Sequence, residues 1–141
     1  MVLGQAMDCY FENKPLSLDE VKELHRNKTA KLIAVSLQMG AVVVGLEKKV
    51  QDDLYAFGID LGLLFQIQDD IIDETQSEEE AGKTTGNDGD KNSFINLLGL
   101  ERSIQEADTL AKDLQRRFET FDVKVQIALE SLIEKYLYRH K

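Results

Sequence analysis

The residues best suited to chemistry are three aspartates in the stretch FQIQDDIID, which spans residues 65–73. Residues four apart on a helix lie one turn apart on the same face, so Asp69 and Asp73 form a row with Gln66 one turn below. Asp70 stands to the side of that row. Like charges at this spacing destabilise a helix, and apolar neighbours increase the cost. A hard divalent cation compensates it, so the pattern predicts a Mg²⁺ site at Asp69, Asp70 and Asp73 with room for water and a phosphate.

Two other interpretations of the acidic residues must be considered. The aspartates could be a solvated acidic end of a helix, although negative charge is unfavourable in a C-terminal turn. The stretch DGDKNSFI, residues 88–95, also resembles the start of a calcium loop. That loop requires glycine where Ser93 stands and glutamate where Gly99 stands, so the sequence disfavours calcium binding.

Composition narrows the class of protein further. The chain has 141 residues and a formal charge of -9, which argues against nucleic acid as a partner. Its length fits a single domain, residues 1–141. The lone Cys9 cannot form an internal disulfide, and no signal-peptide pattern opens the sequence, so a cytoplasmic location is predicted. No apolar run reaches the roughly 18 residues that a membrane span needs, so none is expected.

Hydrophobic periodicity predicts an all-α helical bundle and no strand. Helices are expected over residues 2–12, 18–25, 28–44, 47–74, 101–120 and 123–138, with a short one within 93–101 and a surface loop over 75–92. Ser17 and Glu20 form a capping box for the second helix, and Gly45 should end the third. The third helix is so apolar that we expect it to be largely buried. Gly58 and Gly62 are expected to allow a neighbouring helix to approach closely.

The aspartate stretch resembles the second aspartate-rich motif of the trans-isoprenyl diphosphate synthases. Four other stretches match the family in order: GQAMD (4–8), HRNKT (25–29), AGKTTGND (81–88) and KNSFINLLGLE (91–101). The resemblance covers essentially the whole chain and is closest to the short-chain bacterial type. The family's first aspartate motif, its paired arginines and its N-terminal basic residues are absent from this sequence. The chain therefore resembles the C-terminal half of the isoprenoid synthase fold, part of a polyprenyl synthetase domain.

The resemblance implies a prenyltransferase of the geranyltranstransferase type. In the family, an allylic diphosphate ionises with the help of Mg²⁺, and its carbocation is attacked by isopentenyl diphosphate. The implied product is farnesyl diphosphate, and the full-length enzyme is expected to be a homodimer that takes prenyl diphosphates as its partners. With one of two aspartate motifs, the chain is expected to be inactive alone and to expose apolar faces that drive association. The alternative is a non-catalytic helical subunit or binding module related to the synthases.

Residue roles follow from the matched motifs and are implied by the resemblance. Asp69 resembles the direct Mg²⁺ ligand, and Asp70 and Asp73 would act as ligands or through bound water. Lys28 and Thr29 resemble the pair that contacts the allylic diphosphate. The implied catalytic set includes Asp69 and Lys28.

The remaining roles concern the substrate. Gln66 resembles the family's glutamine near the forming cation and completes the implied catalytic set. Lys83 and Lys91 resemble lysines that reach the diphosphate. Phe65 resembles an aromatic residue beside the isopentenyl group, although core packing would also explain it. Arg139 could approach the second diphosphate, or it could simply favour a helix C-terminus.

Overall fold

The computed structural model describes residues 1–11, 14–81 and 93–137, and only the backbone in 77–81, 131–133 and 135–137. Within these residues the chain is helical and contains no strand, so the all-α prediction is confirmed. The elements are α1 (Val2–Tyr10), α2 (Leu18–His25), the π-helix η1 (Arg26–Ala30), α3 (Lys31–Val43), α4 (Lys48–Ala81), α5 (Phe94–Leu98), α6 (Leu100–Glu119) and α7 (Val123–Leu137). No helix in the described part is both long and apolar enough to span a bilayer.

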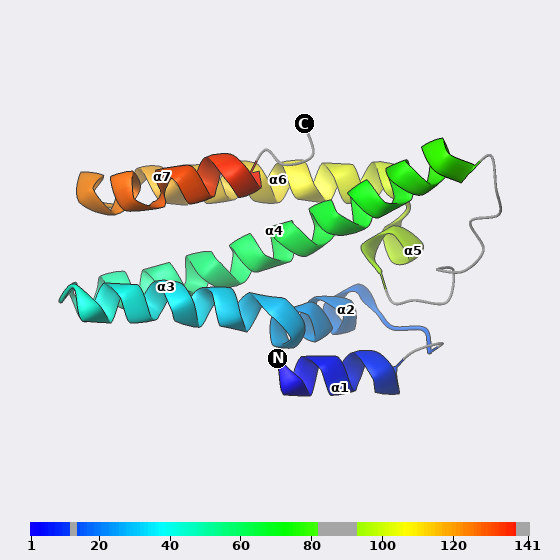
Figure 1. The fold of residues 1–141 in the computed structure, drawn as a ribbon, viewed down its shortest axis with the longest axis horizontal. Coiled ribbons are helices and arrows are strands. Elements are labelled where there is room, and N and C mark those ends of the chain that lie inside the picture. The colour runs from blue at the N-terminus through cyan, green and yellow to red at the C-terminus, as the bar shows by residue number, and fades with distance from the viewer. Residues whose placement is uncertain (12–13, 82–92, 138–141) are drawn as a thin grey trace.

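The longest helix, α4, runs through the middle of the bundle, with α3 on one side and α6 and α7 on the other (Figure 1). A helix between two layers must be apolar on more than one face. Accordingly Leu61, Leu63, Leu64 and Ile67 are all buried, although they point in different directions around the axis. This central position makes α4 the element against which the other site residues are placed.

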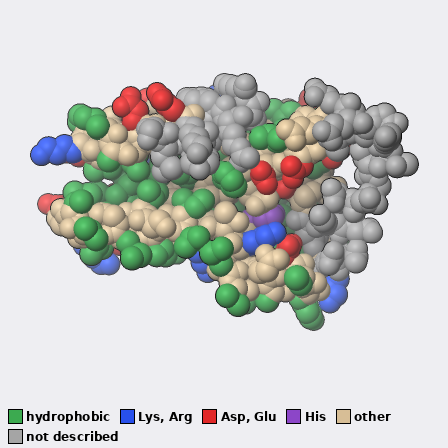
Figure 2. All heavy atoms as spheres, in the orientation of Figure 1, with side chains coloured by type: hydrophobic (Ala, Val, Ile, Leu, Met, Phe, Trp, Pro, Cys, Tyr) green, Lys and Arg blue, Asp and Glu red, His purple; other side chains and the backbone are tan. Residues whose placement is uncertain are grey.

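The apolar helix α3 is not largely buried, and this prediction is wrong. Its buried residues are Ala34 and Ala41, while Leu32 is 51% and Met39 is 61% exposed. Figure 2 shows hydrophobic side chains gathered on the surface along this helix. The cause is geometric, because α4 covers one face of α3 and the described residues leave the opposite face open.

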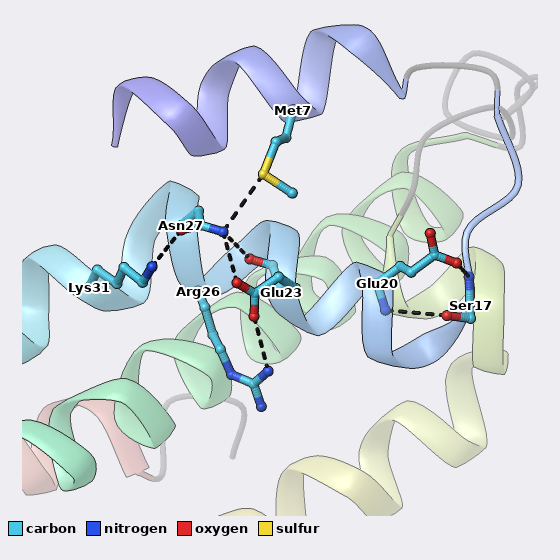
Figure 3. Close-up of polar contacts among 7 residues, drawn as sticks. All are labelled: Met7, Ser17, Glu20, Glu23, Arg26, Asn27 and Lys31. Atoms are coloured by element: carbon cyan, nitrogen blue, oxygen red, sulfur yellow. Dashed lines mark hydrogen bonds and ion pairs between the residues drawn. The ribbon is translucent and has the colours of Figure 1, made fainter.

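Two helix ends follow the predicted local chemistry. The Glu20 amide donates to Ser17 Oγ at 3.3 Å, and the Ser17 amide donates to Glu20 Oε1 at 3.2 Å, which is the expected capping box (Figure 3). After α3, Gly45 adopts a φ of 75°. The amides of Gly45 and Leu46 donate to the carbonyls of Val42 and Ala41, as in a Schellman motif.

The close approach predicted at the two α4 glycines is present. A Cβ atom at Gly58 would lie 2.6 Å from Ala34 Cα, and one at Gly62 would lie 2.5 Å from Ala30 Cα. Since Gly58 faces Ala34 and the later Gly62 faces the earlier Ala30, α3 and α4 run antiparallel. The end of α4 that carries the aspartates therefore lies toward η1 and α2.

The end of α4 differs from the prediction. The helix continues to Ala81 instead of ending at Glu74, because residues 76–81 contain good helix formers and neither glycine nor proline. The aspartates thus lie within the helix, outside the last turn where its dipole acts. The rest of the predicted loop, residues 82–92, falls outside the described residues. The lone Cys9 is exposed.

Candidate functional site

Lys28 and Thr29 lie in η1, a single π-helical turn that joins α2 to α3. Such turns are rare and occur frequently at functional sites. The buried Asn27 stabilises the turn: its Nδ2 donates to the Glu23 carbonyl at 3.0 Å, and its Oδ1 accepts from Lys31 Nζ at 2.7 Å (Figure 3). The bond to the Glu23 carbonyl therefore ties the backbone that carries both predicted diphosphate contacts to α2.

The first helix holds η1 from the other side and gives the GQAMD stretch a structural role. A Cβ at Gly4 would lie 2.1 Å from the Lys28 backbone nitrogen, so only glycine permits this contact. One turn later, Asp8 Oδ2 lies 2.9 Å from Lys28 Nζ, and both side chains are about one-third exposed. Asp8 is not among the site residues predicted from the sequence, although the matched stretch GQAMD contains it.

An apolar pocket of about 390 Å³ lies between α3 and α4. Thr29 and Phe65 line it together, which places two predicted substrate contacts in one cavity. The other lining residues are Leu32, Ile33, Ser36, Leu37 and Leu61. Phe65 is half-buried, so it forms part of a pocket wall and not of the closed core.

Asp70 is held by the protein through both carboxylate oxygens. Gln66 Nε2 donates to Oδ1 at 3.0 Å, and the Phe94 backbone amide donates to Oδ2 at 3.0 Å. Burial raises the pKa of Asp70 to about 6, because desolvation outweighs the two hydrogen bonds and nearby Asp69 and Asp73 add repulsion. Asp73 is exposed by contrast, whereas Asp69 is half-buried, as Asp70 is.

The structure does not gather all predicted ligands at one point. Among the described residues, no group of three or more His, Cys, Asp or Glu side chains is arranged to hold a metal. Mg²⁺ commonly uses one or two carboxylates together with water and phosphate oxygens, so a pair such as Asp69 and Asp73 fits this cation. The metal assignment of the three aspartates remains a prediction. Lys83, Lys91 and Arg139 lie outside the described residues.

The raised pKa of Asp70 predicts a pH dependence of stability in metal-free buffer. In the unfolded chain the pKa is near 3.8, and in the folded chain it is about 6. Between these values the folded state binds more protons, so this carboxyl makes stability fall as pH rises through the window. After a discount for partial exposure, we expect a loss of about 1–2 kcal/mol.

Urea unfolding of the parent chain and of Asp70→Asn, with a chelator present, measures this effect as a difference. The free energy of unfolding of the parent should fall relative to that of Asp70→Asn as pH rises through the window, and the difference should stay constant above it. Asp113→Asn is the control: Arg116 holds the pKa of Asp113 below its usual value, so the effect of Asp113 on stability has the opposite sign and falls at pH values below this window. Parallel curves for the parent and Asp70→Asn would contradict the prediction.

Comparison with known proteins agrees with these features. A family model described as polyprenyl synthetase matches residues 1–131. The chain belongs to the polyprenyl synthetase family. It is 37% identical over 142 residues to a chloroplastic geranylgeranyl pyrophosphate synthase of Capsicum annuum, covering 99% of this chain and 38% of that protein. It is 39% identical over 107 residues to a farnesyl diphosphate synthase of Micrococcus luteus, covering 74% and 37%.

Solved structures of polyprenyl synthetase relatives share the fold. A Helicobacter pylori geranyltransferase, solved with magnesium and isoprenyl diphosphate, superposes with a TM-score of 0.83 at 49% identity, covering 96% of this chain and 46% of that one. The predicted family and isoprenoid synthase fold are therefore confirmed. This chain spans 38% and 37% of the length of the two curated relatives above.

Proposed function

We propose that the chain supplies part of the active site of a prenyltransferase, which joins an allylic diphosphate to isopentenyl diphosphate. The observation that carries this proposal is the shared pocket of Thr29 and Phe65. Asp69 follows Phe65 by one helical turn on the same face of α4. Lys28 precedes Thr29 in η1. The polar head of a bound substrate would then lie toward Lys28 and the aspartates, and its apolar part toward Leu37.

This polarity suits a prenyl diphosphate, which is a hydrocarbon chain attached to a doubly phosphorylated head. The apolar lining would take the hydrocarbon and keep water from a reactive cation. The Lys28 ammonium would face the departing diphosphate and favour its growing negative charge. Asp69 and Asp73 would hold Mg²⁺, which when bound supplies further positive charge to the same leaving group. Phe65 would present its ring near the cation.

Within this class we propose farnesyl diphosphate as the product. The similarity to a Micrococcus luteus farnesyl diphosphate synthase and to a Helicobacter pylori geranyltransferase supports this choice. Relatives named geranylgeranyl synthases have similar identity, so a product assay must separate fifteen-carbon from twenty-carbon chains. We also propose that the complete enzyme is a homodimer in the cytoplasm.

Binding of Mg²⁺ and inorganic pyrophosphate, measured by calorimetry, tests the proposal on the chain itself. Pyrophosphate should bind only when Mg²⁺ is present. Asp69→Asn should weaken this binding at least about tenfold, the loss typical even of residues behind a metal ligand. Asp53→Asn is a matched control, because Asp53 is exposed near the opposite end of α4. A chain that binds no pyrophosphate would favour the non-catalytic subunit.

Turnover distinguishes a partial site from a complete one. The 141-residue chain, given geranyl and isopentenyl diphosphates with Mg²⁺, should form no product because it carries one aspartate motif. Addition of the separately produced N-terminal half of a related synthase should restore condensation. Product formed by the chain alone would show that one aspartate motif suffices and would refute the partial-site proposal.

A further inference from the structure

The second aspartate of the motif makes a long-range contact that helical spacing does not predict. Asp70 Oδ2 accepts a hydrogen bond from the Phe94 amide, 24 residues away, at 3.0 Å. Its other oxygen, Oδ1, accepts from Gln66 Nε2 at 3.0 Å. Each oxygen of this carboxylate therefore already has a defined donor within the protein.

The donor amide belongs to the first residue of α5, a helix of only five residues. So short a helix is unstable alone, because its first amides have no partner within the helix. Here Ser93 Oγ accepts from the Asn96 amide at 3.1 Å, and Asp70 accepts from the Phe94 amide. Asp70 thus acts as an external cap that joins α5 to the aspartate-bearing helix α4.

Side-chain packing at the same point makes the contact specific. The Phe94 ring is fully buried and stacks on His25 of α2, with ring centroids 5.1 Å apart. Phe94 therefore meets α4 through its backbone and α2 through its ring. A shift of its amide away from Asp70 would also move the ring from its place beside His25, which is the last residue before η1.

We propose that Asp70 is a positioning residue that fixes α5 against α4, and that it is not a ligand of the metal. Its carboxylate orientation is set by Gln66 and Phe94, and the described part of the chain shows no three-carboxylate group around a common point. The metal contacts of the motif then fall to Asp69 and Asp73. This division of roles rests on the proposed function, whereas the positioning role does not.

Three variants separate the two roles. Asp70→Asn keeps an oxygen that can accept from the Phe94 amide, and Gln66 can rotate its amide to face the new NH₂ group. Asp70→Ala removes the acceptor. Asp69→Asn serves as the matched control, because it makes the same chemical change one residue away.

Amide hydrogen exchange of the 141-residue chain tests positioning without any metal. The Phe94 amide should exchange at least about tenfold faster in Asp70→Ala, because it loses its acceptor, and nearly at the parent rate in Asp70→Asn and Asp69→Asn. Unchanged exchange in Asp70→Ala would overturn the positioning role. If exchange is unchanged in Asp70→Ala but the parent chain binds pyrophosphate, the positioning role fails and the proposed function still holds.

Calorimetry with Mg²⁺ and inorganic pyrophosphate tests the second half of the proposal. We expect Asp70→Asn to bind within about threefold of the parent, whereas Asp69→Asn loses at least about tenfold. Equal losses in both variants would make Asp70 a ligand and overturn its assignment. If the parent itself binds nothing, the proposed function and the division of ligands both fail, and the exchange result alone decides the positioning role.

Discussion

Replacement of Gly62 by leucine is expected to lower the free energy of unfolding by about 3 kcal/mol or more, the upper range for overpacked sites. A Cβ atom at this position would lie 2.5 Å from Ala30 Cα and 2.6 Å from Ala30 Cβ. The nearest atom is backbone, so no rotation of a side chain relieves the clash. The π-helix η1 and α4 would have to separate at this contact.

Gly40→Ala is the matched control for this substitution. Gly40 also lies inside a helix, but an added Cβ there would meet nothing within 4 Å. This change should therefore stabilise the chain by about 0.5–1 kcal/mol, the usual advantage of alanine within a helix. Urea unfolding followed by circular dichroism measures both variants. A Gly62→Leu chain as stable as the parent would show that the two helices do not approach this closely.

The close approach of Gly62 to Ala30 also matters for the pocket. Ala30 immediately follows Thr29, and Leu61 precedes Gly62, and both of these neighbours line the cavity. Glycine at position 62 thus sets the spacing of the two pocket walls. We expect Gly62→Leu to impair ligand binding even under conditions in which the variant remains folded.

Local sequence signals predicted the helices and much of their packing. The capping box at Ser17, the helix stop at Gly45 and the close contacts at Gly58 and Gly62 each depend on the chemistry of a few neighbouring residues. Such features are readable because capping oxygens and glycines act on the backbone beside them. The family could be predicted for a different reason: five separate stretches of the sequence match its motifs in the same order.

Features that depend on distant partners could not be predicted in this way. The apolar composition of α3 does not reveal how many of its faces are covered. The π-turn at Lys28 requires a shift of hydrogen bonds by one residue, for which the sequence has no clear signal. The orientation of Asp70 depends on Phe94, 24 residues later, and that of Lys28 on Asp8, 20 residues earlier.

Lys28→Met is expected to weaken Mg²⁺-dependent pyrophosphate binding by about 10- to 100-fold, since hydrogen bonds to charged groups are the strong ones. In the chain without ligand, Asp8 holds the Lys28 ammonium at 2.9 Å. This contact keeps the ammonium near η1, so little reorganisation is needed when an anion enters. Methionine has a similar length and apolar stem, so it removes the charge with little change in packing.

Lys31→Met separates this effect from the general loss of one positive charge. Lys31 lies one turn further on and is exposed, with its ammonium on Asn27 Oδ1 at 2.7 Å. It should change pyrophosphate affinity by no more than about threefold, or roughly 0.6 kcal/mol. Calorimetry on both variants makes the comparison. Equal losses would mean that net charge attracts the anion, and the specific role of Lys28 in the π-turn would then be wrong.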